Sequence, residues 1–293
     1  MTEFGKMVGT FHARRGAAWG GRLQLLPDGA LNPRSRIIEL PALVAELYPA
    51  VPEEKLARAS FALCAFSDAI VACDDVIDYA PADPTIARRI PAIAVIFAEA
   101  YRGFAELFGG EPRFWDALQR YACEYVDALD AEARIARDGE AWTACTPEAC
   151  LAIVRGKNGL VRLVDAAVAA LSGCPQIPGA DAILLEWFAG EQMLDDLNDW
   201  REDVRDRNVS VLLRNTCEVR PDPRETEAIG LRMYREGHVD RVLALAGELA
   251  RGAQAIAEAA GGSRLVALIA ERRTRLVQRR EQIATALASL AQC

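Results

Sequence analysis

The sequence is poor in histidine, in basic clusters and in long apolar runs, and each shortage argues against a class of protein. Its two histidines, His12 and His238, stand far apart, which argues against a zinc site or a Ser-His catalytic arrangement. A net charge of −8 argues against a nucleic-acid partner, because a phosphate-binding surface needs clustered bases, and only the stretch "ERRTRLVQRR" is locally basic. No uninterrupted apolar run reaches the ~18 residues of a membrane span, so we expect no transmembrane segment.

The sequence also lacks a CxxC pair and a secretory signal at its N-terminus, although it contains eight cysteines. Several of these cysteines lie inside apolar helical runs. Such thiols pack as small apolar side chains, and proteins that keep them reduced are typical of the cytoplasm. We therefore expect buried free thiols and a cytoplasmic location.

No stretch alternates between apolar and polar residues for long enough to form a sheet, and we find no linker or internal repeat. Apolar residues recur instead at spacings of three and four. Helices should start where Asp, Thr or Glu stands beside proline, as at Thr146-Pro147, and end at glycine, as at Asp138-Gly139. The predicted helices cover residues 53–80, 84–108, 112–137, 147–172, 181–206, 223–236, 238–260 and 263–290. The prediction is an all-α fold of eight or more helices, with one domain over residues 1–293.

An apolar helix ends in three carboxylates within the stretch "ACDDVIDYAPADP" at positions 72–84. Asp74 and Asp78 share one helix face, and Asp75 lies about 100° away from Asp74. The column that leads back along this face is apolar or small, and it contains Leu63, Ser67, Ile70 and Val71. Burial of ionised carboxylates costs several kcal/mol unless a cation compensates, and a helix C-terminus disfavours negative charge. Metal binding is one explanation, and emergence of residues 74–80 into solvent is the other.

A second acidic stretch, "EQMLDDLNDWREDVRDRN", begins at Glu191 and carries seven acids. Most of its polar side chains fall within roughly 140° of arc on a helical wheel. A solvated amphipathic helix has the same pattern, but Leu184 and Phe188 continue the acidic face as an apolar wall. Two such helices can face each other across a cavity with an apolar interior and a metal-binding mouth. Hard cations such as Mg²⁺ prefer carboxylate and phosphate oxygens, so the pattern predicts a phosphorylated ligand with a hydrocarbon chain.

With these residues the sequence resembles the class I isoprenoid synthases, the all-α superfamily of terpene cyclases, trans-prenyltransferases and squalene or phytoene synthases. The DDxxD motif is matched by Asp74, Asp75 and Asp78. The second motif of prenyltransferases, QxxDDxxD, is matched by Gln192, Asp195, Asp196 and Asp199. The NSE motif of cyclases is similar to Asn198, Asp199, Glu202, Arg205 and Asp206, with Glu202 in place of Ser or Thr and Asp206 in place of Glu. The resemblance implies a single helical bundle around a central apolar cavity.

The segment "RGKNG" provides a third point of resemblance. Arg155, Asn158 and Gly159 look like the diphosphate sensor, linker and helix-break effector of cyclases, and Lys157-Asn158 is similar to the Lys-Thr pair of prenyltransferases. The glycines favour a helix break, and close packing against a neighbouring helix is the alternative, above all for Gly156. Near the chain end, Arg279 and Arg280 stand where cyclases have an Arg-Tyr pair, here without the tyrosine.

The resemblance implies chemistry that begins with loss of diphosphate from a prenyl diphosphate of C15 or C20, with Mg²⁺ as cofactor, three ions when substrate is bound. The implied metal ligands are Asp74, Asp78, Asp195, Asn198, Asp199, Glu202 and Asp206. The implied diphosphate-binding and nearby polar residues are Arg155, Lys157, Gln192, Arg205, Arg279 and Arg280. The expected apolar wall contains Leu63, Ser67, Ile70, Val71 and Phe188, with Trp187 and Phe61 as further members.

Several functions fit this reading, and a terpene cyclase is the first. A trans-prenyltransferase must also bind isopentenyl diphosphate; the QxxDDxxD match favours it, but Gly20-Gly21-Arg22 has no second base before Arg34. A squalene or phytoene type of condensing enzyme is suggested by the "RDRNVS" that follows the second motif. A non-catalytic helical regulatory protein is the alternative from another class. The sequence leaves the oligomeric state open, a homodimer included.

Overall fold

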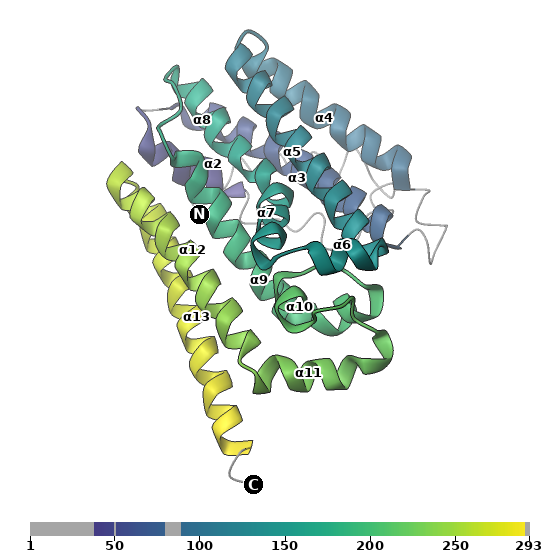
Figure 1. The fold of residues 1–293 in the computed structure, drawn as a ribbon. Coiled ribbons are helices and arrows are strands. Elements are labelled where there is room, and N and C mark those ends of the chain that lie inside the picture. The colour runs from purple at the N-terminus through teal and green to yellow at the C-terminus, as the bar shows by residue number, and fades with distance from the viewer. Residues whose placement is uncertain (1–37, 50, 80–88, 291–293) are drawn as a thin grey trace. The chain divides into compact units, whose positions relative to one another are not determined.

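The computed structural model describes residues 38–49, 51–79 and 89–290, apart from the side chains of Asp78, Tyr79, Ala288 and Leu290. These residues form helices joined by short connections, and no strand occurs among them (Figure 1). The all-α prediction is confirmed.

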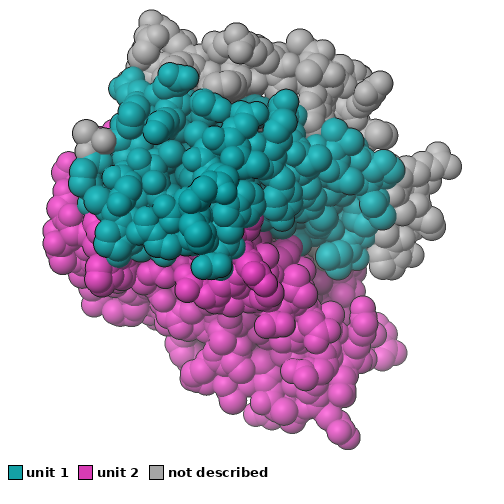
Figure 2. Space-filling model, turned by 90° about the horizontal axis from the view of Figure 1, so that it is seen from above, with its two compact units in different colours: residues 1–116, 163–176 teal, residues 117–162, 177–293 magenta. Residues whose placement is uncertain are grey.

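The chain divides into two compact units, shown in different colours in Figure 2. Unit 1 contains residues 1–116 and 163–176, and unit 2 contains residues 117–162 and 177–293. The boundaries fall inside one helix, between Asp116 and Ala117, and at two points further along the chain. That the chain acts as one domain stays a prediction.

Unit 1 is built around a pair of long helices, α3 and α4, that pack against each other. Gly103 of α4 makes this packing close, because a Cβ there would lie 2.9 Å from the Cβ of Ala62 on α3. The described elements are α2 (Leu40–Val44), η3 (Ala45–Leu47), α3 (Glu53–Tyr79), α4 (Ile90–Phe108), the start of α5 (Pro112–Arg137) and α8 (Leu163–Ser172).

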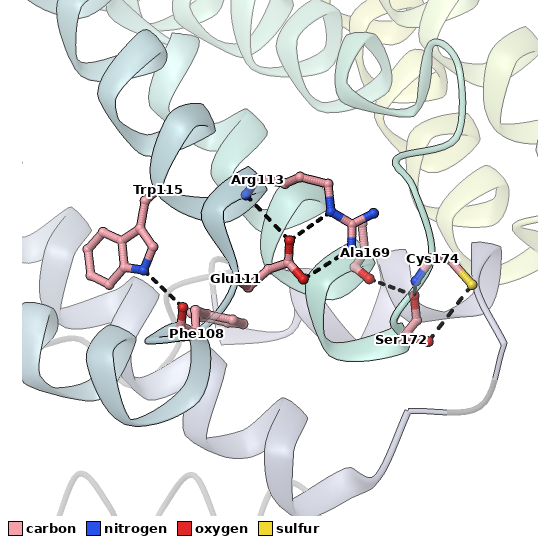
Figure 3. A network of polar contacts seen from close by, with 7 residues as sticks. All are labelled: Phe108, Glu111, Arg113, Trp115, Ala169, Ser172 and Cys174. Carbon is pink, nitrogen blue, oxygen red and sulfur yellow. Dashed lines mark hydrogen bonds and ion pairs between the residues drawn. The ribbon is translucent and has the colours of Figure 1, made fainter.

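Aromatic side chains fill the contact between α3, α4 and the start of α5. Phe104 lies at the centre, with its ring 5.8 Å from that of Phe66 and 5.2 Å from that of Phe114. The connection between α4 and α5 is closed by local hydrogen bonds (Figure 3): Trp115 Nε1 donates to the carbonyl of Phe108 at 2.9 Å. These bonds and the buried rings fix where α4 ends and α5 begins.

Among the described residues one helix, α3, is apolar and long enough to cross a membrane by length and composition. An 18-residue window within its segment Glu53–Ile77 has a mean hydropathy of 1.6, and 61% of that window is buried inside the protein. Isolated charges interrupt this segment, so it contains no uninterrupted apolar run of such length. A buried core helix has the same length and composition, so the finding is weak support for a span.

Unit 2 is organised around α9, which packs along α12, while α12 packs along α13. Gly190 makes the packing of α9 on α12 close, because a Cβ there would lie 3.2 Å from the carbonyl oxygen of Ala246 on α12. The other elements of this unit after α5 are α6 (Gly139–Ala144), α7 (Pro147–Lys157), η5 (Gly159–Arg162), α9 (Ala180–Asp206), α10 (Val211–Thr216), η6 (Pro223–Glu225), α11 (Thr226–Arg235), α12 (His238–Ala260) and α13 (Ser263–Leu290).

Most long helices lie where periodicity predicted them, and the differences have local causes. The predicted helix over 147–172 is broken, because α7 ends at Lys157 and η5 intervenes before α8. Asp138-Gly139 was expected to mark a helix end, but the Asp138 carboxylate accepts from the backbone N–H of Glu140 and starts α6. The short helices α2, α6 and α10 were missed, since they have too few residues to show a period.

Gly156 lets α7 approach α5 closely within unit 2. A Cβ at this position would lie 2.6 Å from the Cβ of Ala128 and 3.3 Å from the carbonyl oxygen of Glu124. Helix α7 continues through Gly156 to Lys157, so this glycine serves helix packing and the break comes two residues later.

We predict that Gly156→Ala destabilises the protein by about 1–3 kcal/mol, because the new methyl group forces α7 away from α5. The control is Gly252→Ala on α12, where a Cβ meets nothing within 4 Å and alanine should stabilise the helix by up to about 1 kcal/mol. Urea denaturation followed by circular dichroism measures both variants. Equal free energies of unfolding for Gly156→Ala and the wild type would contradict this, because they would show that α7 can move away from α5 without loss of stability.

Candidate functional site

The first acidic motif lies at the end of α3 in unit 1. Asp74 and Asp75 are half-buried, and Asp75 forms an ion pair with Arg89, with Oδ2 and Nη1 3.6 Å apart. Burial raises the pKa of Asp75, and the charge of Arg89 lowers it in part. The side chain of Asp78, the third aspartate of the motif, lies outside the described residues. The acids therefore do not simply emerge into bulk solvent, and Arg89 is a partner that the motif alone did not reveal.

The predicted apolar wall on α3 differs in exposure along its length. Leu63 is buried, Ser67 and Ile70 are half-buried, and the side chain of Val71 is 48% exposed. The last turns of α3 are therefore open on one side, where Ile77 is exposed as well.

In unit 2, three basic side chains surround the break between α7 and η5. Helix α7 begins at a true cap, since Thr146 Oγ1 accepts from the backbone N–H of Ala149 at 3.1 Å. Its C-cap is Asn158, whose Nδ2 donates to the carbonyl of Val154 at 3.0 Å. Arg155 and Lys157 occupy the last turn, where positive charge interacts favourably with the helix dipole.

Each of these bases is paired with a glutamate from a neighbouring helix. Arg155 Nη2 lies 2.7 Å from Glu186 Oε2 on α9. Lys157 Nζ lies 2.8 Å from Glu132 Oε2 on α5. Arg162 of η5 pairs with Glu124 of α5 and stacks over the ring of Tyr121, 4.1 Å from its centroid. Arg155 and Lys157, two of the residues predicted to bind diphosphate, are therefore held in ion pairs in this structure.

Helix α9 turns two of its carboxylates inward. Asp196 is only 8% exposed, and Asp203 is half-buried. The side chain of Gln192 donates through Nε2 to Asp196 Oδ1 at 3.0 Å, while Asp196 Oδ2 is buried and has no hydrogen-bond partner. Burial raises the pKa of Asp196 to about 7 and that of Asp203 to about 6. The nearby charge of Lys157 lowers both pKa values, but less than burial raises them.

The remaining polar residues of the second motif point outward. Those that are exposed are Asp195, Asn198, Asp199, Glu202 and Asp206. Although Asp195 reaches solvent, the surrounding protein raises the pKa of its carboxyl, and the charge of Asp199 one turn later raises it further. Arg205 makes two hydrogen bonds to Asp206, at 2.8 and 2.6 Å, which lower the pKa of Asp206.

The predicted residues near the chain end lie elsewhere on unit 2. Arg280 of α13 is exposed and pairs with Asp240 of α12, with Nη2 2.7 Å from Oδ2, and Arg279 is exposed too. Another arginine of α13 does reach α9: Arg272 Nη1 lies 3.6 Å from Oε2 of Glu191. Phe188 is half-buried beside the buried Trp187, which fits the predicted apolar half of α9.

Sequence reasoning missed the partners of the bases and the inward direction of Asp196. Glu124, Ala128 and Glu132 stand at intervals of four, so one face of α5 places a carboxylate on either side of a small residue. That pattern is visible in the sequence. Asp196 also falls on the apolar stripe that Met193 and Trp200 define, and an acid on a buried stripe is itself a signal.

Comparison with solved structures identifies the fold. The chain is similar to geranyltranstransferase from Thermotoga maritima, with 15% identity, 94% of this chain and 100% of that chain covered, and a TM-score of 0.67. It is similar to geranylgeranyl pyrophosphate synthase from Lactobacillus brevis, with 15% identity, 90% and 94% covered, and a TM-score of 0.71. It is also similar to that of Corynebacterium glutamicum, complexed with isoprenyl diphosphate and magnesium, with 15% identity, 94% and 97% covered, and a TM-score of 0.69.

The chain has the isoprenoid synthase fold. No protein-family model matches the sequence, and a search of curated proteins finds no relative. At such low identity the likeness concerns the fold alone, so the chemistry must be argued from the side chains.

The acidic side chains of α9 offer the oxygen atoms that a hard divalent cation such as Mg²⁺ prefers as ligands. Within the described part of the chain, no three side chains of His, Cys, Asp or Glu are grouped so that they could hold a metal ion by themselves. Mg²⁺ commonly takes only one or two carboxylates and completes its shell with water and phosphate oxygens. The carboxyl oxygens of α9 suit such an ion, and the buried, unpartnered Asp196 Oδ2 is an acceptor that lacks a donor.

We predict that Asp196→Asn changes the pH dependence of stability. An acid whose pKa is higher in the folded state loses stabilisation as pH rises from its unfolded pKa, near 4, to its folded pKa, about 7. As the pH rises over this interval, the free energy of unfolding of the wild type should therefore fall relative to that of the variant. The difference should reach on the order of 3 kcal/mol at pH 8. Urea denaturation between pH 4.5 and 8 tests this, and parallel stability curves would contradict it.

Proposed function

We propose that the chain is an enzyme that acts on prenyl diphosphates, and within that class a trans-prenyltransferase that joins an allylic prenyl diphosphate to isopentenyl diphosphate. The observation that carries this proposal is the arrangement of the QxxDDxxD motif on α9. Gln192 donates to the inward Asp196, Asp195 stands at the neighbouring outward position, and the pKa of Asp196 responds to the charge of Lys157. The matched structures are named as a geranyltranstransferase and geranylgeranyl pyrophosphate synthases, and these names support the choice.

In the proposed reaction, the acidic residues of α3 would hold Mg²⁺ in unit 1, and those of α9 would hold it in unit 2. The proposed ligands are Asp74, Asp78, Asp195, Asn198, Asp199, Glu202 and Asp206. When bound, Mg²⁺ supplies positive charge that offsets the charge of the departing diphosphate. The resemblance to isoprenoid synthases also implies three ions when substrate is bound.

The chain's own bases bind and orient the diphosphate. Arg155 and Lys157 each have a flexible stem and a carboxylate partner that a diphosphate can replace. Charge-assisted hydrogen bonds from these groups to phosphate oxygens are stronger than neutral ones. The half-buried Phe188 of α9 suits the hydrocarbon and would help keep water from the allylic cation.

A terpene cyclase is the second candidate, and one observation favours it. The backbone breaks at Asn158–Gly159 between α7 and η5, in the segment that resembles the cyclases' sensor and helix-break effector. The missing second base after Gly20-Gly21-Arg22 also favours a cyclase, although these residues lie outside the described part of the chain. Elongation is placed first because all three quoted structures carry names of prenyl-chain-forming enzymes.

The function is tested by incubating the purified protein with geranyl, farnesyl or geranylgeranyl diphosphate and Mg²⁺, with and without isopentenyl diphosphate. Products are identified by mass spectrometry. We expect longer prenyl diphosphates only where isopentenyl diphosphate is present. Formation of a hydrocarbon or alcohol from a single prenyl diphosphate would make the protein a cyclase. Absence of any product from all of these substrates would reject both candidates.

We predict that Asp195→Asn lowers turnover by about 10²-fold or more, because it removes a carboxylate ligand of the Mg²⁺ that would offset the charge of the diphosphate. Asp74→Ala in the first motif should have a comparable effect while the helical circular dichroism stays near wild type. Asp181→Asn, in the first turn of the same helix as Asp195, is the matched control and should keep near wild-type turnover. Loss of helical signal in the first two variants would show that these aspartates serve folding instead.

A further inference from the structure

Of the three bases around the break between α7 and η5, Arg162 is the one that the protein encloses most. Its side chain is 12% exposed, against 38% for Arg155 and 32% for Lys157. The guanidinium group of Arg162 pairs with Glu124 of α5 and lies over the buried ring of Tyr121, 4.1 Å from its centroid. Arg155 and Lys157 are therefore more open to a ligand, while Arg162 is held inside unit 2.

The side chain of Arg162 also closes the turn at which α7 ends. Its Nε donates to the carbonyl of Gly159 at 3.1 Å, and the backbone N–H of Val161 donates to the carbonyl of Asn158 at 3.1 Å. Carbonyl groups at the end of a helix have no partner within the helix and must find donors elsewhere. Arg162 supplies one of these donors, and its own position is fixed by the pairing with α5.

Gly159 leaves the space that this arrangement needs. A Cβ at Gly159 would lie 2.9 Å from Nη2 of Arg162 and 3.8 Å from Oε2 of Glu124. The closest atom is thus the end of a flexible side chain, and Gly159 does not have a positive φ. An alanine at this position would therefore displace the guanidinium group without straining the backbone of the break.

We propose that Arg162 is a positioning residue for diphosphate binding: it holds the break after α7 and so fixes the last turn, which carries Arg155 and Lys157. This inference rests on the proposed function, in which those two bases bind the diphosphate. Gly156 anchors α7 on α5 from one side of Lys157, and the bond from Arg162 to the carbonyl of Gly159 anchors it from the other. A ligand binds more weakly to a turn that it must first order, because the lost conformational freedom opposes binding.

The first test is the affinity for inorganic pyrophosphate in the presence of Mg²⁺, measured by isothermal titration calorimetry. Arg162→Met removes the donor to the break, so we expect this variant to bind pyrophosphate about tenfold more weakly than wild type. In steady-state assays the same loss should raise KM for the prenyl diphosphate and leave kcat unchanged, since the turn contributes equally to binding of substrate and transition state.

Arg220→Met is the matched control for the loss of an arginine at a helix end. Arg220 Nη1 donates to the carbonyls of Ala136 and Arg137 at the end of α5, at 3.2 and 3.0 Å. The control therefore removes the same charge and the same kind of bond within unit 2, away from the break. We expect it to bind pyrophosphate as the wild type does.

Gly159→Ala separates the position of the guanidinium group from its charge, because it displaces the group and keeps the charge. We expect weaker pyrophosphate binding here as well. The double variant Gly159→Ala/Arg162→Met should bind no more weakly than Arg162→Met alone, because both changes remove the same contact. If Arg162→Met does not fold, Gly159→Ala decides, and wild-type affinity in that variant overturns the inference.

Hydrogen exchange followed by mass spectrometry tests the break without any ligand. Backbone amides of residues 158–162 should exchange several-fold faster in Arg162→Met than in the wild type. The amides of α12 should keep their wild-type rates, which shows that the variant remains folded. Unchanged exchange at residues 158–162 would show that Arg162 does not hold the break, and the inference would be wrong.

The outcomes separate this inference from the proposed function. If the wild type binds pyrophosphate and Arg162→Met binds it equally well, or if Arg220→Met loses as much affinity as Arg162→Met, the positioning role is wrong and the proposed function stands. If the wild type does not bind pyrophosphate, both are wrong. Weaker binding by Arg162→Met and Gly159→Ala, without further loss in the double variant, supports the inference.

Discussion

The contact between Gly156 and Ala128 determines most of what is distinctive about unit 2. Without a side chain at Gly156, α7 lies directly on α5, and the glutamates on either side of Ala128 meet Lys157 and Arg162, which both follow the glycine. Close packing of this kind leaves the backbone few alternatives. It places the last turn of α7 beside the inward carboxylates of α9, so one steric constraint sets the geometry of the charged groups.

The charges so assembled are unfavourable for folding by themselves. Asp196 and Asp203 take positions on the buried side of α9 where an apolar residue would pack at lower cost, and burial raises the pKa of both. A nearby ammonium offsets this cost only in part. Groups held in such strained electrostatic surroundings are typical of functional sites, where a ligand supplies the missing charge. The cost to stability and the capacity to bind a cation are therefore two aspects of the same arrangement.

Periodicity and punctuation in the sequence predicted the long helices, because each depends on residues that are near one another in the chain. The start of α7 at Thr146-Pro147 and the end of α12 before Gly261 follow from such local signals. The partners of the bases could not be found in this way, since Lys157 and Glu132 are distant in sequence and meet only when α7 packs on α5. The half-exposed Val71 was also beyond reach, because composition shows that a helix is apolar but not which neighbours cover it.

The two motifs that overlap on α9 occupy different environments, and this bears on the choice between chain elongation and cyclisation. The Gln192–Asp196 hydrogen bond belongs to the prenyltransferase pattern and lies on the inward side of the helix. The cyclase pattern uses Asn198, Glu202 and Asp206, all exposed, and Asp206 is already engaged by Arg205. An acid tied to a neighbouring arginine must give up two hydrogen bonds before it can ligate a metal, whereas the inward Asp196 has an oxygen without a partner. On energetic grounds Asp196 is better prepared for a cation than Asp206, and Asp196 belongs to the prenyltransferase pattern.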